Sequence, residues 1–194
     1  MRKTETKLKI LAIGADIIHE KGFNNTGLNE ILKAAEVPKG SFYFYFDSKD
    51  DFGLALIDYY VEQLKNLYRK NGLMKIERPD ERLFSFFDIV MNFMEGQGFR
   101  KGCPIGNLVQ EMSDLNEDFR VKLESVFSKS ADFIQRCLEE GMEVGIFKKT
   151  DAVREQAEFI FNSFEGAIMR AKLSKDNKAF LHFKINIYGL IKEH

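Results

Sequence analysis

Apolar residues recur along most of the chain at the spacing of one face of an α-helix. In the segment 4–21, Leu8, Leu11, Ala15 and Ile18 share such a face, and a glycine follows the segment. The same periodicity predicts longer helices at about 48–69, 79–96, 104–113, 116–143, 151–173 and 176–192. Together with two short helices between residues 26 and 46, the pattern predicts an all-α protein with about nine helices.

The stretch KGSFYFYFDSKDD, residues 39–51, carries alternating aromatic residues but has no neighbouring strand with which to pair. A helix of about two turns would place Phe42 and Phe46 inward, would expose Tyr43 and Phe44, and would leave Tyr45 at the border. Upstream, Thr26 is expected to cap a short helix; downstream, Ser48 and Asp51 form a helix-start signal. Two short helices joined by a tight turn predict a helix-turn-helix motif, which reads DNA.

Composition narrows the class of protein. The 194 residues are 44% hydrophobic and 30% charged, with a formal net charge of −1, so contact with DNA requires a local surface. No run of about 18 apolar residues predicts a membrane span. Two cysteines without a metal-binding pattern indicate a reducing cytoplasm, and neither a metal nor a cofactor is implied.

The segment 8–54 resembles the DNA-binding region of TetR-type transcriptional repressors. The resemblance is carried by Gly22-Phe23, Thr26, Ile31, Ala34-Ala35, Val37, Gly40-Ser41, Tyr43, Phe46 and Lys49. It implies a DNA-binding domain at 1–48 and a helical ligand-binding and dimerisation domain at 49–194. Glu36 stands where the family usually has glycine, so the turn forms without a positive φ or else strains Glu36.

The resemblance also implies which residues contact DNA. The recognition helix presents most of them, the preceding helix adds two, and a lysine holds a phosphate. The implied set is Thr26, Asn29, Lys39, Gly40, Ser41, Tyr43, Phe44, Tyr45 and Lys49. The apolar ring of Phe44 suits a thymine methyl group, and Ser41 is short enough to reach a base edge.

The segment RKGCPIGNLVQEMSDLNEDFR, residues 100–120, is similar to a TetR subgroup with a Gly-Cys motif, in which some members respond to electrophiles through this cysteine. Pro104 places Cys103 near a helix N-terminus, where the helix dipole, Arg100 and Lys101 would stabilise a thiolate. An inert packing role for Cys103 remains open. The candidate ligand-binding residues are Cys103, Phe84, Phe87, Met91, Asn107 and Phe127.

The last two predicted helices carry apolar stripes. The resemblance implies that they form a four-helix dimer interface, with candidate residues Phe159, Ser163, Ala167, Phe180, Phe183 and Ile187. Packing within one chain would explain part of the same stripes.

The function expected from these features is that of a ligand-responsive regulator. A homodimer would bind a double-stranded, palindromic operator and would be released by a small apolar or electrophilic effector, with Cys103 as a candidate sensor. Two alternatives remain. A thiol-dependent enzyme would need a base near Cys103, and no histidine lies near it in sequence. A helix-turn-helix protein could also act without any ligand.

Overall fold

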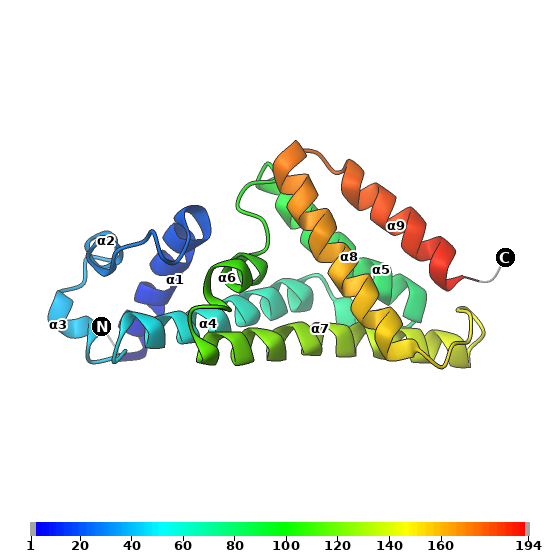
Figure 1. Ribbon diagram of the computed structural model, residues 1–194, viewed down its shortest axis with the longest axis horizontal. Helices are drawn as coiled ribbons and strands as arrows, with labels where there is room; N and C mark the ends of the chain where they lie inside the picture. Colours follow the sequence, from blue (N-terminus) through cyan, green and yellow to red (C-terminus); the bar gives the residue numbers. More distant parts are fainter. Residues whose placement is uncertain (1–2, 193–194) are drawn as a thin grey trace. The chain divides into compact units, whose positions relative to one another are not determined.

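The computed structural model describes residues 3–192, and the regular secondary structure of this part of the chain is all helical (Figure 1). The prediction of an all-α fold with about nine helices is confirmed for these residues. The elements are α1 Lys3–Lys21, α2 Leu28–Ala34, α3 Lys39–Phe42, α4 Lys49–Lys70, the 3-10 helix η1 Leu73–Lys75, α5 Pro79–Gly96, α6 Pro104–Met112, α7 Glu117–Glu143, α8 Val153–Ser174 and α9 Lys178–Ile191.

The chain divides into two compact units. The N-terminal unit comprises residues 1–64 and 104–124, and the C-terminal unit comprises residues 65–103 and 125–194. Helices α4 and α7 therefore contribute to both units. The expected domains, 1–48 and 49–194, were defined by function, whereas these units are defined by packing. The expected domain limits therefore remain a prediction.

In the N-terminal unit, α4 packs closely against α1. Gly14 of α1 lies directly against the Phe52 ring, so a larger residue at position 14 would displace that ring. The Tyr60 hydroxyl of α4 donates a hydrogen bond to the Ala15 carbonyl oxygen at 2.7 Å. These contacts fix α1, the first helix of the unit, against the helix that follows the aromatic stretch.

The two helix-start signals expected around the aromatic stretch have different outcomes. The Asp51 N–H donates to Ser48 Oγ and the Asp47 N–H donates to Asp51 Oδ2, each at 3.0 Å, so the predicted start of α4 is confirmed. The predicted cap at Thr26 is wrong. Helix α2 begins one residue later, after Gly27, and the buried Thr26 hydroxyl donates instead to the Gly22 carbonyl oxygen at 2.7 Å.

The core of the C-terminal unit is rich in phenylalanine. The Phe87 ring of α5 lies 4.8 Å from Phe164 of α8 and 5.0 Å from Phe183 of α9, measured between ring centroids. Helices α8 and α9 run side by side in opposite directions (Figure 1). Within residues 3–192, none of the helices is long and apolar enough to cross a membrane.

Candidate functional site

The turn between α2 and α3 is tight and contains a left-handed residue. The Val37 N–H donates to the Leu32 carbonyl oxygen at 3.0 Å, and Glu36 between them has a φ of 52°. Pro38, with φ −60°, then leads into α3. Of the two possibilities left open for Glu36, the strained conformation is the one observed.

The aromatic stretch is divided between the core and the surface, as predicted. Phe42 and Phe46 are 0% and 2% exposed and pack against the Phe52 ring, whereas Tyr43 and Phe44 are 53% and 62% exposed. Helix α3 is shorter than the expected two turns. It ends at Phe42, because residues 43–45 continue as a turn in which the Tyr45 N–H bonds the Phe42 carbonyl oxygen at 2.8 Å.

The other candidate DNA-binding residues fall into two groups. Asn29, Lys39 and Gly40 are exposed, and Ser41 and Tyr45 are half-buried beside them. Thr26 and Lys49 are instead engaged inside the N-terminal unit: Thr26 is fully buried, and Lys49 Nζ donates to the Phe23 carbonyl oxygen at 2.7 Å and lies over the Phe23 ring. Burial lowers the pKa of the Lys49 ammonium.

Sequence reasoning missed one contact near this motif. Glu111, near the end of α6, accepts a hydrogen bond through Oε2 from the Asn24 N–H at 3.1 Å, in the turn that precedes α2. Gly22, with a φ of 91°, lies against the same carboxylate. Residues 24 and 111 are far apart in the chain, and no local pattern would pair them.

The candidate sensor Cys103 lies directly before α6, as predicted from Pro104. The loop before it contains four residues with positive φ, and two of these, Phe99 and Lys101, are not glycine. Lys175 Nζ, just after α8, bonds the Phe99 carbonyl oxygen at 3.1 Å. A loop held in such a conformation by surrounding contacts is typical of functional sites.

Cys103 is half-buried, and its thiol hydrogen-bonds the carboxyl group of Glu165 on α8. Burial raises the pKa of Glu165 to about 6, and the hydrogen bond with Cys103 opposes that shift. The Tyr68 hydroxyl of α4 lies in the same electrostatic environment, where burial and the charges of Cys103 and Glu165 raise its pKa. Cys137, by contrast, is 1% exposed, and burial raises its pKa, as expected for a packing residue.

The remaining ligand-binding candidates do not form one group. Phe87 and Met91 are buried in the C-terminal core, and Phe127 packs on Phe161 at 5.1 Å between ring centroids. Asn107 lies on α6, in the N-terminal unit. Phe84 lines a separate hollow.

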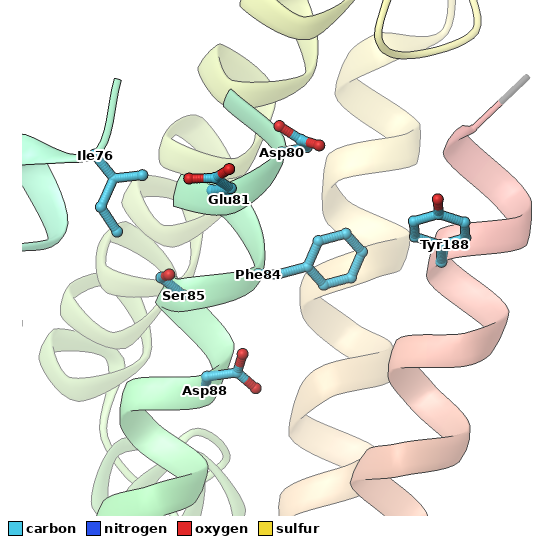
Figure 2. Close-up of a pocket in the computed structure, with 7 residues that line it drawn as sticks. All are labelled: Ile76, Asp80, Glu81, Phe84, Ser85, Asp88 and Tyr188. Carbon is cyan, nitrogen blue, oxygen red and sulfur yellow. The ribbon is translucent and has the colours of Figure 1, made fainter. Parts of the chain in front are cut away.

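A hollow of about 390 Å³ lies between α5 and α9. Figure 2 shows the Phe84 ring directed toward Tyr188, with acidic side chains of α5 at its edge. The chain's own lysines face these rings: Lys184 Nζ lies 5.8 Å from the centroid of Phe84, and Lys192 Nζ lies 5.2 Å from that of Tyr188. No cluster of three or more potential metal ligands occurs in residues 3–192.

The dimerisation candidates differ in exposure. Phe159 is 57% exposed and Ser163 is half-buried, whereas Ala167, Phe180, Phe183 and Ile187 are buried within the chain's own core. The same two helices also carry exposed apolar side chains outside this set of candidates, among them Met169, Leu173, Leu181 and Ile185.

Family models match both parts of the chain. The model described as "Bacterial regulatory proteins, tetR family" matches residues 10–56, and "Tetracyclin repressor-like, C-terminal domain" matches residues 79–186, more than half of the chain. The chain belongs to the TetR family. It is therefore a ligand-responsive, DNA-binding transcriptional regulator, a class distinct from the enzymes considered above.

Curated relatives and solved structures agree with this assignment. The transcriptional regulator AcuR of Cereibacter sphaeroides is 40% identical over 164 residues, which cover 84% of this chain and 75% of AcuR. The repressor DhaR of a Mycobacterium species is 30% identical over 94% of this chain and 90% of DhaR. The crystal structure of Escherichia coli NemR in its reduced form superposes with a TM-score of 0.86 at 29% identity, over 96% of this chain and 97% of NemR.

Proposed function

We propose that the chain is a cytoplasmic repressor that binds a palindromic operator as a homodimer. A small apolar or electrophilic effector releases it, and Cys103 is the group that reacts. The relatives DhaR and NemR are both named repressors, which favours repression. The half-buried thiol of Cys103, on a loop with strained backbone, favours a reactive role over plain packing.

The observation that carries the DNA-binding part of the proposal is the exposed face around α3. Tyr43 and Phe44 project from a base of buried phenylalanines, beside the exposed side chains of Asn29 and Lys39. Large apolar side chains at the surface of such a short segment have no role in its core. We assign Lys39 and Tyr43 to phosphates, Ser41 to a base edge and Phe44 to a thymine methyl group. In the same proposal, Thr26 and Lys49 support this face from inside.

Substitution of Phe44 tests this assignment. We expect Phe44→Ala to lower the affinity for DNA from upstream of the chain's own gene by about 10-fold or more, because a lost base contact costs about 1–3 kcal/mol. Fluorescence anisotropy at fixed salt concentration would measure the affinity. Phe93→Ala, at a phenylalanine of α5 that is 53% exposed, is the matched control. Equal effects of the two substitutions would contradict the proposed DNA-binding face.

The exposed apolar face of α8 and α9 supports the homodimer. Ile185 and Leu173 are 69% and 72% exposed, and Met169 and Leu181 lie on the same two helices. Exposed apolar residues gathered on adjacent helices mark a protein interface. Because the core residues of these helices are already covered by their own chain, the partner chain would cover this outer face.

A charged residue introduced on the exposed apolar face of α8 and α9 tests the proposed dimer. We expect Ile185→Arg to convert a two-chain particle to a one-chain particle at micromolar concentration and to weaken operator binding, since two half-sites no longer act together. Sedimentation velocity would measure the mass. Val144→Arg, at a position 64% exposed just after α7, should leave both unchanged. A wild-type mass of one chain would exclude the proposed dimer.

A further inference from the structure

The peptide group between Phe23 and Asn24, in the turn before α2, is held on both sides by side chains of other helices. Its carbonyl oxygen accepts a hydrogen bond from Lys49 Nζ of α4 at 2.7 Å. Its N–H donates to Glu111 Oε2 of α6 at 3.1 Å. Because a peptide group is planar, two hydrogen bonds to its opposite sides fix its orientation, and with it the direction in which the chain enters α2.

The Glu111 carboxylate fits closely against this turn. A β-carbon added to Gly22 would lie 2.9 Å from Glu111 Oε1 and 3.2 Å from its carboxyl carbon, so glycine leaves the room that the side chain needs. Burial lowers the pKa of the Lys49 ammonium, and the charges of Asp50 and Glu111 oppose that shift. The carboxylate and the ammonium therefore hold the same peptide group and stabilise each other.

The corner between α6 and α7 packs on the same turn. The Phe119 ring of α7 lies 5.3 Å from the Phe23 ring, measured between centroids, and both rings are buried. A β-carbon added to Gly53 of α4 would lie 2.4 Å from Phe119 and 2.6 Å from Phe23. The Asn116 amide nitrogen donates to Asp50 Oδ2 at 3.2 Å. The corner thus belongs to the same packed unit as the helix-turn-helix motif, although it lies outside the residues that the tetR-family model matches.

We propose that Glu111 is a positioning residue for DNA binding, which holds the turn before α2 so that α2 and α3 meet the DNA in the correct orientation. Residues 25–27 connect this turn to α2, and the buried Thr26 hydroxyl donates back to Gly22. Helix α2 is joined to the next turn by the hydrogen bond from the Val37 N–H to the Leu32 carbonyl oxygen. A displaced turn would therefore displace α3. This inference rests on the DNA-binding face proposed around α3.

Electrostatics alone predicts the opposite effect for loss of Glu111. A carboxylate in a DNA-binding unit repels phosphates, so removing its charge should strengthen binding unless the position of the turn matters. Two conservative substitutions separate charge from position. Glu111→Asp keeps the charge but withdraws the carboxylate by one methylene group, whereas Glu111→Gln loses the charge but keeps an oxygen acceptor at the same reach.

The test is the affinity of the full-length variants for a duplex that the wild-type protein selects from a randomised library, measured by fluorescence anisotropy at fixed salt concentration. We expect Glu111→Ala to lower the affinity by about 10-fold or more, because base contacts in both half-sites are misplaced. Glu111→Asp should lower it by about 5-fold, the effect of one weakened base contact. Glu111→Gln should stay within about 2-fold of the wild type, since it can still accept the Asn24 N–H.

Asp114→Ala is the matched control. It removes one negative charge from an exposed position close to Glu111 in the chain and leaves the acceptor of the Asn24 N–H in place. It should bind DNA as tightly as the wild type or more tightly. An equal loss of affinity in Asp114→Ala and Glu111→Ala would overturn the proposal.

Hydrogen exchange of the segment 22–26, followed by mass spectrometry, shows whether the turn is released. We expect faster exchange in Glu111→Ala and Glu111→Asp, wild-type exchange in Glu111→Gln, and unchanged exchange in the middle of α4, as in a folded protein. If Glu111→Ala fails to fold, Glu111→Asp decides. Glu111→Ala at wild-type affinity, or Glu111→Asp at wild-type affinity beside a weak Glu111→Gln, would overturn the positioning role.

Phe44→Ala in the same assay separates this inference from the proposed function. If Phe44→Ala binds as the wild type does but Glu111→Ala binds weakly, the face assigned around α3 fails and Glu111 is still required for DNA binding. If Phe44→Ala binds weakly but Glu111→Ala binds as the wild type does, the positioning role fails and the face stands.

Discussion

The aromatic residues of segment 42–46 are divided between core and surface, whereas most of those in the C-terminal unit lie inside. Phe44 is 62% exposed and its neighbour Phe42 is fully buried; Phe87 and Phe164 of the C-terminal unit are 0% and 2% exposed. The same residue type therefore carries different information in the two units. Where a short segment exposes rings that it does not need for packing, the surface points to a partner. Rings that are buried, such as those of Phe87 and Phe164, indicate only a core.

Truncation of buried and exposed rings should separate the two kinds of residue most strongly. We expect Phe42→Ala and Phe87→Ala each to lower the free energy of unfolding by about 3–5 kcal/mol, through lost burial and the cavity that remains. Phe44→Ala should change it by no more than about 0.5 kcal/mol. Urea denaturation followed by circular dichroism would measure all three. A large destabilisation by Phe44→Ala would remove the contrast on which its proposed role depends.

A smaller effect is expected at a charged contact of the C-terminal unit. Asp80, 8% exposed at the start of α5, accepts hydrogen bonds from Arg78 at 2.9 Å and from Lys192 at 3.2 Å. We expect Asp80→Asn to cost about 1–2 kcal/mol, since it weakens both charged hydrogen bonds. Asp151→Asn, at an exposed position of the same unit, is the control and should be nearly neutral.

The same carboxylate predicts a dependence on pH. Burial alone would raise the pKa of Asp80, but the hydrogen bonds from Arg78 and Lys192 outweigh it, so the pKa is lowered. Ionised Asp80 therefore stabilises the fold fully above pH 3.8, the ordinary pKa of an aspartate. This stabilisation is lost as the pH falls through the lowered pKa of the folded state. In acid titrations of stability, the wild type should lose its advantage over Asp80→Asn below about pH 4. A constant difference would contradict the assignment.

The smallest expected change in stability is at Glu36, one of two left-handed residues that can be compared. Glu36→Gly should stabilise the protein by about 0.5–1 kcal/mol, because glycine adopts a φ of 52° without strain and the Lys9 ion pair at 3.7 Å is exposed. Lys175→Gly, at a φ of 58°, should give no such gain, because it also removes the hydrogen bond to Phe99. Thermal unfolding midpoints would show the difference; equal gains would mean that the Lys175 contact contributes nothing.

Local sequence signals predicted much of the fold and part of the site. Periodicity located the helices, and the spacing of Phe42 and Phe46 identified the inward face of the aromatic stretch. The missing glycine at Glu36 marked the turn but left its conformation open, and the structure shows the strained one. Each of these features depends on residues a few positions apart. Helix propensity and turn chemistry act at that range.

Contacts between distant segments could not be predicted in this way. Nothing local indicates that Glu111 reaches Asn24, or that Glu165 meets Cys103. Periodicity also shows which face of a helix is covered without showing what covers it. For that reason the sequence leaves open whether the stripe of α9 that contains Phe183 faces a partner chain or its own core. In the structure the chain's own core buries Phe183, and a different row of residues remains outside.

Through the hydrogen bond between Glu111 and Asn24, α6 connects the loop of Cys103 to the helix-turn-helix motif. The helix has nine residues, a length of about 13 Å, and starts at the residue that follows Cys103. Residue 111 is the eighth of these nine residues, so the Glu111 carboxylate lies near the opposite end of the helix from Cys103. A single peptide bond therefore separates the candidate sensor from a short helix whose far end hydrogen-bonds the main chain just ahead of α2.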